Sequence, residues 1–244
     1  MKCRLFDIDY DYITMTQAVE RAEEMLAEPG VHYVVTPNTE MAWRCRKDAR
    51  LKKAIAHADL VLPDGIGVVY GARILKSPLP ERVPGIDFIS NVLEKTAGKG
   101  EHVFLLGSKP GVADMAAENL KAKYPGLDIC GIQHGYFDDT EQVIRHINAS
   151  GATILLVCLG FPKQEYWMID HRQELTTVRL MAGLGGSMDV FAGTAKRAPE
   201  KWQKLGIEWL YRLLEDPKRI KRMSVLPAFM FSVIWQRITG KGNK

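Results

Sequence analysis

The sequence contains little that would support a disulfide-linked, exported or membrane-spanning protein. Its four cysteines among 244 residues are isolated, with no C-x-x-C pair, which argues against a disulfide scaffold or zinc ribbon and fits a reducing cytosol. No apolar run reaches the roughly 18 residues of a spanning helix. The first residues, MKCRLFDIDYDY, carry charges where an export signal needs an apolar core. We therefore expect a cytoplasmic protein without a spanning segment.

Motifs of the common nucleotide and metal enzymes are also missing. The glycine-rich segments 107–111 and 183–187 match neither G-x-G-x-x-G nor Walker A, which disfavours a P-loop NTPase or an NAD enzyme. The six histidines lack ligand spacing, and no Ser/His/Asp signature occurs. A D-x-D element, Asp7-Ile8-Asp9, falls within or just after the first expected strand, far in sequence from the other candidate loops. We predict no metal and no cofactor.

Charge is distributed unevenly along the chain. The net charge of +4 combines a body, residues 1–195, of net −4 with a tail, residues 196–244, of net +8. A basic tail indicates an anionic partner, either a membrane surface, a phosphorylated ligand or nucleic acid. The body lacks the basic, aromatic-interleaved face of a nucleic-acid binder, so we predict no nucleic acid.

Strand and helix patterns alternate through the body and predict an α/β fold with a mostly parallel, Rossmann-like sheet. The run 153–159 (TILLVCL) is typical of a strand buried on both faces. Strands are expected at 4–9, 32–35, 60–62, 102–106, 127–132, 153–159 and 178–182, and the helix 39–57 is expected to break near Asp48. Ligands bind at the carboxyl ends of such strands, which would gather the loops 36–38, 63–67, 107–111, 160–165 and 183–189.

Each candidate residue in these loops has two interpretations. Asp64 is either a simple Asp-Gly turn residue or a general base at a strand end. Thr36 and Asn38 either begin a helix, with Asn38 as its N-cap, or bind a polar ligand such as a sugar. The proline-rich loop 76–85 is either a rigid surface loop or a stiff lid that presents Arg82 to an anion. The glycine-rich turns expose backbone N–H groups that suit phosphate.

The tail is expected to form two or three helices that meet a membrane surface. A cluster of four cations at 218–222 precedes the apolar segment MSVLPAFMFSVIW, residues 223–235. That segment has about half the length of a membrane span, and a basic cluster beside a short apolar helix is typical of interfacial helices. We predict an α/β catalytic core, residues 1–195, and a helical membrane-associating appendage, residues 196–244.

Eight segments, in order along essentially the whole chain, resemble the WecG/TagA/CpsF glycosyltransferase family. They are TPNTEM (36–41), LVLPDGIGVVYG (60–71), PLPERVPGIDF (78–88), FLLGSKPGVA (104–113), HGYF (134–137), LGFPKQEYW (159–167), GLGGSMDVFAGTAKRAP (183–199) and EWLYRLLEDPKR (208–219). The resemblance implies an inverting enzyme on the inner membrane face. It would transfer N-acetylmannosamine, or a related sugar, from a UDP-sugar to undecaprenyl-diphosphate-N-acetylglucosamine in teichoic-acid-type polysaccharide synthesis.

The resemblance also implies roles for individual residues. Asp64 in PDG would be the general base. The remaining assignments are Thr36, Asn38, Arg82 and Gln164 for substrate; Gly107, Gly186, Ser187 and Asp189 for the nucleotide; and Arg212, Arg219 and Arg222 for the diphosphate and the membrane. We hypothesise that the tail closes over the core at the membrane and brings one or more of these arginines to the departing diphosphate.

Several alternatives remain open at this stage. One alternative is that the same fold uses another donor, such as UDP-glucose in exopolysaccharide assembly. A protein of a different class, a peripheral nucleotide-binding protein without catalysis, is also compatible with the sequence. Exposed apolar surface on a core that lacks its tail would allow a homo-oligomer to form through the core.

Overall fold

The computed structural model describes residues 1–215, 217, 220 and 224–240, with only the backbone described for residues 204 and 212. It confirms the predicted α/β fold. Six strands form one sheet in the order β4-β3-β8-β7-β5-β6, and every neighbouring pair is parallel. The sheet strands are β3 (His32–Val35), β4 (Leu60–Val61), β5 (His102–Gly107), β6 (Asp128–Gln133), β7 (Ile154–Cys158) and β8 (Leu180–Gly183).

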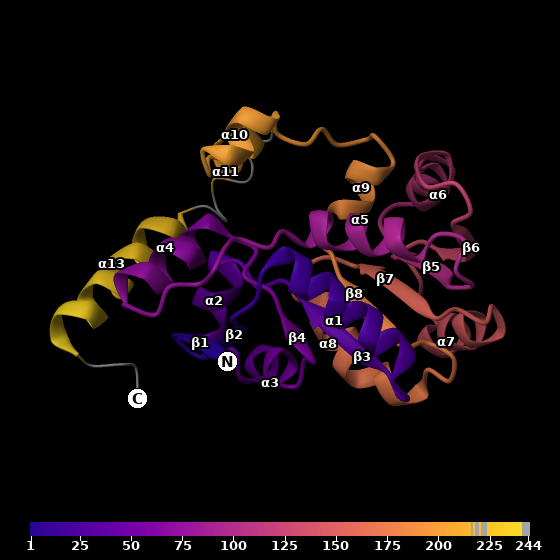
Figure 1. Cartoon of the computed structure of the whole chain (residues 1–244), viewed down its shortest axis with the longest axis horizontal. Helices are drawn as coiled ribbons and strands as arrows, with labels where there is room; N and C mark the ends of the chain where they lie inside the picture. Colours follow the sequence, from indigo (N-terminus) through magenta and orange to yellow (C-terminus); the bar gives the residue numbers. More distant parts are fainter. Residues whose placement is uncertain (216, 218–219, 221–223, 241–244) are drawn as a thin grey trace.

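Helices cover both faces of this sheet (Figure 1). One face packs against α1 (Met15–Ala27), α5 (Gly85–Thr96), α6 (Val112–Lys123) and α9 (Ser187–Phe191). The other packs against α2 (Thr39–Cys45), α3 (Ala49–Ala56), α7 (Thr140–Ala149) and α8 (Lys163–His171), which continues into the 3-10 turn η1 (Arg172–Glu174). Because apolar side chains lie on both sides, every residue of β7 is buried, as predicted for a central parallel strand.

Local capping signals explain several helix boundaries. Thr14 and Gln17 form the reciprocal capping box that begins α1. The helix expected at 39–57 is divided at Asp48, whose carboxylate accepts a hydrogen bond from the Leu51 N–H and caps α3.

The N-terminal prediction was wrong in one respect. The single strand expected at 4–9 is an antiparallel hairpin of β1 (Lys2–Leu5) and β2 (Ile8–Asp11), which lies outside the main sheet. Its turn contains Phe6 in a left-handed conformation, with φ of 53°. The hairpin buries Cys3, Leu5, Ile8 and Tyr10 on one side, so its pattern alternates within each short strand.

Three described helices form the tail: α10 (Glu200–Lys204), α11 (Glu208–Glu215) and α13 (Val225–Thr239). In Figure 1, α13 lies beside α4 (Ile66–Ile74) and α2, while α10 and α11 lie together farther along the molecule. The inner side of α13 is anchored to the core by Phe229, whose ring meets the Phe6 ring edge-on at 5.1 Å. Over the described residues, no helix combines the length and apolar character needed to cross a bilayer.

Candidate active site

The candidate residues meet at the carboxyl edge of the parallel sheet. Thr36 directly follows β3, Asp64 follows the neighbouring β4, and the 183–187 loop follows β8 on the other side of β3. Gln164 lies in the first turn of α8, which follows β7. The strand order therefore brings together segments that are distant in sequence, such as Thr36 and Gly183, 147 residues apart, as the strand-end rule predicts.

Two close approaches hold the Asp64 loop and the Arg82 loop against the end of β3. A Cβ added to Gly67 would lie 2.5 Å from Thr39 Oγ1, and one added to Gly85 would lie 2.9 Å from Thr36 Cγ2. Real Cβ atoms do not approach other atoms this closely, so a larger residue at either position would require the facing threonine side chain or the backbone to move. These contacts keep the two loops close to Thr36 and Thr39.

The central charged contact joins the core to the tail. Arg82 Nη2 lies 2.8 Å from Glu208 Oε2 of α11 and 3.6 Å from Asp64 Oδ1. Side-chain exposure is 31% for Asp64, 19% for Arg82 and 7% for Glu208. Asp64 is thus the most accessible member of this charged triad. Sequence reasoning missed Glu208, because an acidic side chain in a basic tail gave no sign of a partner 126 residues away.

A second pair lies beside the charged triad. Arg197 donates two hydrogen bonds to Asp87, of 2.5 and 2.6 Å, in the bidentate geometry typical of arginine and carboxylate. Burial opposes the charge of Arg197, but the hydrogen bonds to Asp87 and the neighbouring carboxylates of Glu208 and Asp64 raise its pKa. Arg197 is therefore a fixed positive charge close to the proposed base.

Both polar atoms of the Gln164 side chain form hydrogen bonds within the protein. Its Oε1 accepts a hydrogen bond from the Gly185 N–H at 2.9 Å, and its Nε2 donates to Glu165 Oε1 at 2.8 Å. Thr36 Oγ1 donates to the Gly183 carbonyl at 3.3 Å. These bonds hold the 183–187 loop in place. Glu165, which the sequence did not single out, is buried, and desolvation raises its pKa to about 7.

Asn38 has the structural role that the sequence allowed. Its Oδ1 accepts a hydrogen bond from the Met41 N–H at 3.1 Å, which makes it the N-cap of α2. It also lies against the Asp64 loop, since a Cβ on Gly65 would be 3.4 Å from Asn38 Cβ. Capping and a position at the site are therefore compatible, and substrate contact stays a prediction.

The predicted nucleotide residues divide between two places. Gly186 and Ser187 line a cavity of about 60 Å³ together with Asp64, Arg82 and Glu208. Gly107 lies at the end of β5, where an added Cβ would be 2.3 Å from the Cys158 carbonyl oxygen. Asp189 lies in α9. The cavity is much smaller than the several hundred Å³ that ligand sites usually offer, and Glu208 of α11 is part of its lining.

The side chains of the three arginines predicted to bind the diphosphate lie outside the part of the chain that the structure describes. Arg212 belongs to α11, but its side chain is not described, and Arg219 and Arg222 lie outside the described residues. Within the described part of the chain, no three His, Cys, Asp or Glu side chains are grouped as a metal site would need. In the D-x-D element, Asp7 pairs with Lys52 at 2.8 Å.

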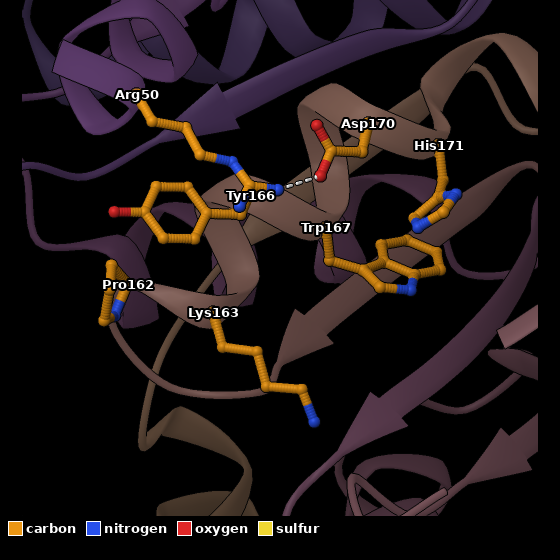
Figure 2. A pocket seen from close by; sticks show the side chains of 7 residues that line it. All are labelled: Arg50, Pro162, Lys163, Tyr166, Trp167, Asp170 and His171. Carbon is orange, nitrogen blue, oxygen red and sulfur yellow. Dashed lines mark hydrogen bonds and ion pairs between the residues drawn. The ribbon is translucent and has the colours of Figure 1, made fainter. Parts of the chain in front are cut away.

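A second hollow, of about 360 Å³, lies on the outer side of α8 next to Arg50 of α3 (Figure 2). Arg50 pairs with Asp170 and lies over the Tyr166 ring. Lys163 donates to the Gly135 carbonyl, and His171 contacts Glu174. Because neighbours already engage these polar groups, the hollow does not have the character of a second site.

Comparison with known proteins identifies the family of the chain. The sequence model of the family described as "Glycosyl transferase WecG/TagA/CpsF family" matches residues 3–243. The chain is 36% identical over 235 residues to N-acetylglucosaminyldiphosphoundecaprenol N-acetyl-beta-D-mannosaminyltransferase of Staphylococcus aureus (strain MRSA252), covering 95% of this chain and 92% of the relative. Proteins of the same name from strains MW2 and COL show the same identity and coverage.

Proposed function

The chain belongs to the WecG/TagA/CpsF glycosyltransferase family, and we propose that it transfers N-acetylmannosamine from a UDP-sugar to undecaprenyl-diphosphate-linked N-acetylglucosamine. The names of the relatives support the transferred sugar and the acceptor, and a UDP-sugar donor follows from the reaction. The observation that carries the proposal is the position of Asp64, an accessible carboxylate at the carboxyl edge of the sheet beside Arg82.

In the proposed mechanism, Asp64 is the general base. It takes the proton from the attacking hydroxyl of the acceptor, which we assign to O4 of N-acetylglucosamine. The hydroxyl oxygen forms a bond to the anomeric carbon while the bond from that carbon to the UDP oxygen breaks, so that UDP leaves with the electron pair. A single displacement inverts the anomeric centre and requires one base and no covalent intermediate.

Positive charge must stabilise the departing diphosphate, and arginine suits this role because it stays charged and can bind phosphate through two N–H groups. We assign Arg82 to substrate and the tail residues Arg212, Arg219 and Arg222 to the diphosphate and membrane. The backbone N–H groups near Gly186 and Ser187 and the turn at Gly107 would receive the nucleotide. Thr36, Asn38 and Gln164 would shape the sugar pocket, with Gln164 acting through the 183–187 loop.

We further propose that the tail, residues 196–244, holds the protein on the inner face of the cell membrane. The inner side of α13 packs on the core, whereas its outer side exposes large apolar residues. The outer-face residues are Phe231, Ile234, Trp235 and Ile238, which are 45–75% exposed. An apolar face of this kind beside basic residues suits the boundary between lipid headgroups and acyl chains, where the acceptor is presented.

The direct test follows UDP release from UDP-N-acetylmannosamine in the presence of lipid-diphosphate-N-acetylglucosamine. Asp64→Asn is nearly isosteric but cannot accept the proton, so we expect turnover to fall by about 10² to 10⁴ while UDP binding persists. Asp114→Asn, an exposed residue on α6, is the matched control and should retain activity. Near-normal turnover by Asp64→Asn would remove Asp64 as the base.

Two further arms separate the alternatives. Parallel reactions with a panel of UDP-sugars, including UDP-glucose, identify the donor. Nucleotide binding without turnover on any donor would indicate a non-catalytic binding protein. Reactions with and without a chelator test the prediction that no metal is needed.

A further inference from the structure

The most buried member of the charged triad comes from the tail. The Glu208 side chain is 7% exposed and contacts Arg82 Nη2 at 2.8 Å, while the Asp64 carboxylate lies 3.6 Å from the same nitrogen atom. Arg82 therefore lies between two carboxylates and is closer to the one that α11 supplies. The other acidic residue of α11, Glu215, is exposed, so the two carboxylates of this helix lie in different environments.

We propose that Glu208 is a positioning residue for the glycosyl transfer: it holds the Arg82 guanidinium on the α11 side and so prevents Arg82 from clamping the Asp64 carboxylate. This inference rests on the proposed role of Asp64 as the base. It means that α11 supplies part of the active site.

This role follows from the way in which neighbouring charges change the pKa and the accessibility of a catalytic carboxylate. An arginine drawn into direct contact lowers the pKa of an aspartate by about one to three units, and it occupies the oxygen atoms that must receive the proton. Removing Glu208 would free Arg82 to approach Asp64, and it would also remove a nearby negative charge. Both changes favour the ionised carboxylate and weaken it as a base.

The other described charges around Asp64 do not replace Glu208. Arg197 is the second cation near Asp64 and Glu208, and its two N–H groups are bound to Asp87 of α5. The charged neighbours of Asp64 thus include Arg82 from the proline-rich loop, Arg197 from the segment before α10 and Glu208 from α11, with Asp87 paired to Arg197.

A different interpretation of the same contact predicts the opposite sign. If Glu208 occupied the place of an anionic substrate group and blocked Arg82, its removal would release the site and raise activity. The sign of the effect therefore separates a positioning residue from an inhibitory contact.

The test measures kcat and kcat/KM against pH for the full-length wild type, Glu208→Gln and Glu208→Asp. In Glu208→Gln we expect the acid limb of the kcat/KM profile to move down by about one pH unit, and kcat at neutral pH to fall about tenfold. Glu208→Asp keeps the charge on a shorter side chain and should recover part of both changes. Glu215→Gln makes the same charge change on the exposed end of α11 and should match the wild type.

An unchanged profile or a higher kcat in Glu208→Gln would overturn the proposal. Should that variant fail to fold, Glu208→Asp decides, because its shorter side chain still predicts a partial shift, and a wild-type profile there refutes the role. The Asp64→Asn variant keeps the two hypotheses apart. An inactive Asp64→Asn with an unaltered Glu208→Gln rejects only the role of Glu208, whereas an active Asp64→Asn rejects the proposed base.

Discussion

Phe229 is one of the side chains that attach the tail to the core, and the effect of its removal on stability should be measurable. Phe229 is completely buried, its ring meets Phe6 edge-on at 5.1 Å, and its Cε1 lies 3.3 Å from the position that a Cβ on Gly71 would take. Leu5 of the N-terminal hairpin packs at the same point. Phe229 thus joins α13, α4 and β1 into one hydrophobic cluster.

The expected cost of Phe229→Ala follows from this burial. An aromatic side chain buries roughly 150–250 Å², which at about 25 cal/mol per Å² corresponds to roughly 4–6 kcal/mol. Measured truncations of buried phenylalanine cost about 3–5 kcal/mol. We therefore expect the free energy of unfolding to fall by about 4 kcal/mol, a large fraction of the stability of about 5–15 kcal/mol that is typical of folded domains.

Urea unfolding followed by circular dichroism measures this change, and the same helix provides its control. Phe231 lies two residues away on α13 but is 68% exposed, so Phe231→Ala should change stability by no more than about 0.5 kcal/mol. Equal effects of the two substitutions would refute the described orientation of α13. A small loss in Phe229→Ala, accompanied by rapid proteolysis of the tail, would show that α13 unfolds separately from the core.

Two more outcomes test the buried carboxyl and the outer face of α13. Burial raises the pKa of Glu165 from 4.5 to about 7, so the folded protein binds more protons than the unfolded chain between these pH values. The free energy of unfolding should therefore fall by about 3 kcal/mol as pH rises through this window. Urea titrations at pH 5 and pH 8 should show a weaker pH dependence of stability in Glu165→Gln than in the wild type. Vesicles containing anionic lipid should retain the wild type and release a Phe231→Ser, Trp235→Ser double variant. The control, Tyr136→Ser, alters an exposed aromatic residue of the core and should bind as the wild type does. Undiminished binding of the double variant would reject the assigned membrane face.

Much of the fold follows from local pattern, because caps and strand periodicity act over a few residues. The helix break expected near Asp48 is confirmed, and the capping box that begins α1 is formed by residues only three positions apart, Thr14 and Gln17. The N-terminal hairpin was missed for a local reason as well. Its turn places Phe6 at φ of 53°, a conformation that bulky residues rarely adopt, and no glycine, asparagine or proline marks the reversal.

The site was predictable only at the level of loops. The rule that ligands bind at strand ends gathers Asp64, Thr36 and Gln164 without any knowledge of contacts. It does not predict which side chains pair, because those contacts form between segments that are distant in sequence. Gln164 bonds to Gly185, and Arg82 bonds to Glu208 on a different element. The local sequence around a glycine-rich turn or an isolated acidic residue does not indicate which distant residue it will contact.

The uneven distribution of charge along the chain is related to the chemistry proposed for this site. The described charged cluster contains three carboxylates, from Asp64, Asp87 and Glu208, and two guanidinium groups, from Arg82 and Arg197. Its net charge of −1 suits a base that must attract a proton but opposes an incoming diphosphate. Arg197 and Glu208 of this cluster belong to the tail, and the further cations of the tail, which has a net charge of +8, would balance the diphosphate under the proposed mechanism. In that mechanism the base comes from the acidic core, whereas the basic tail positions Arg82 through Glu208 and brings the donor and the membrane together.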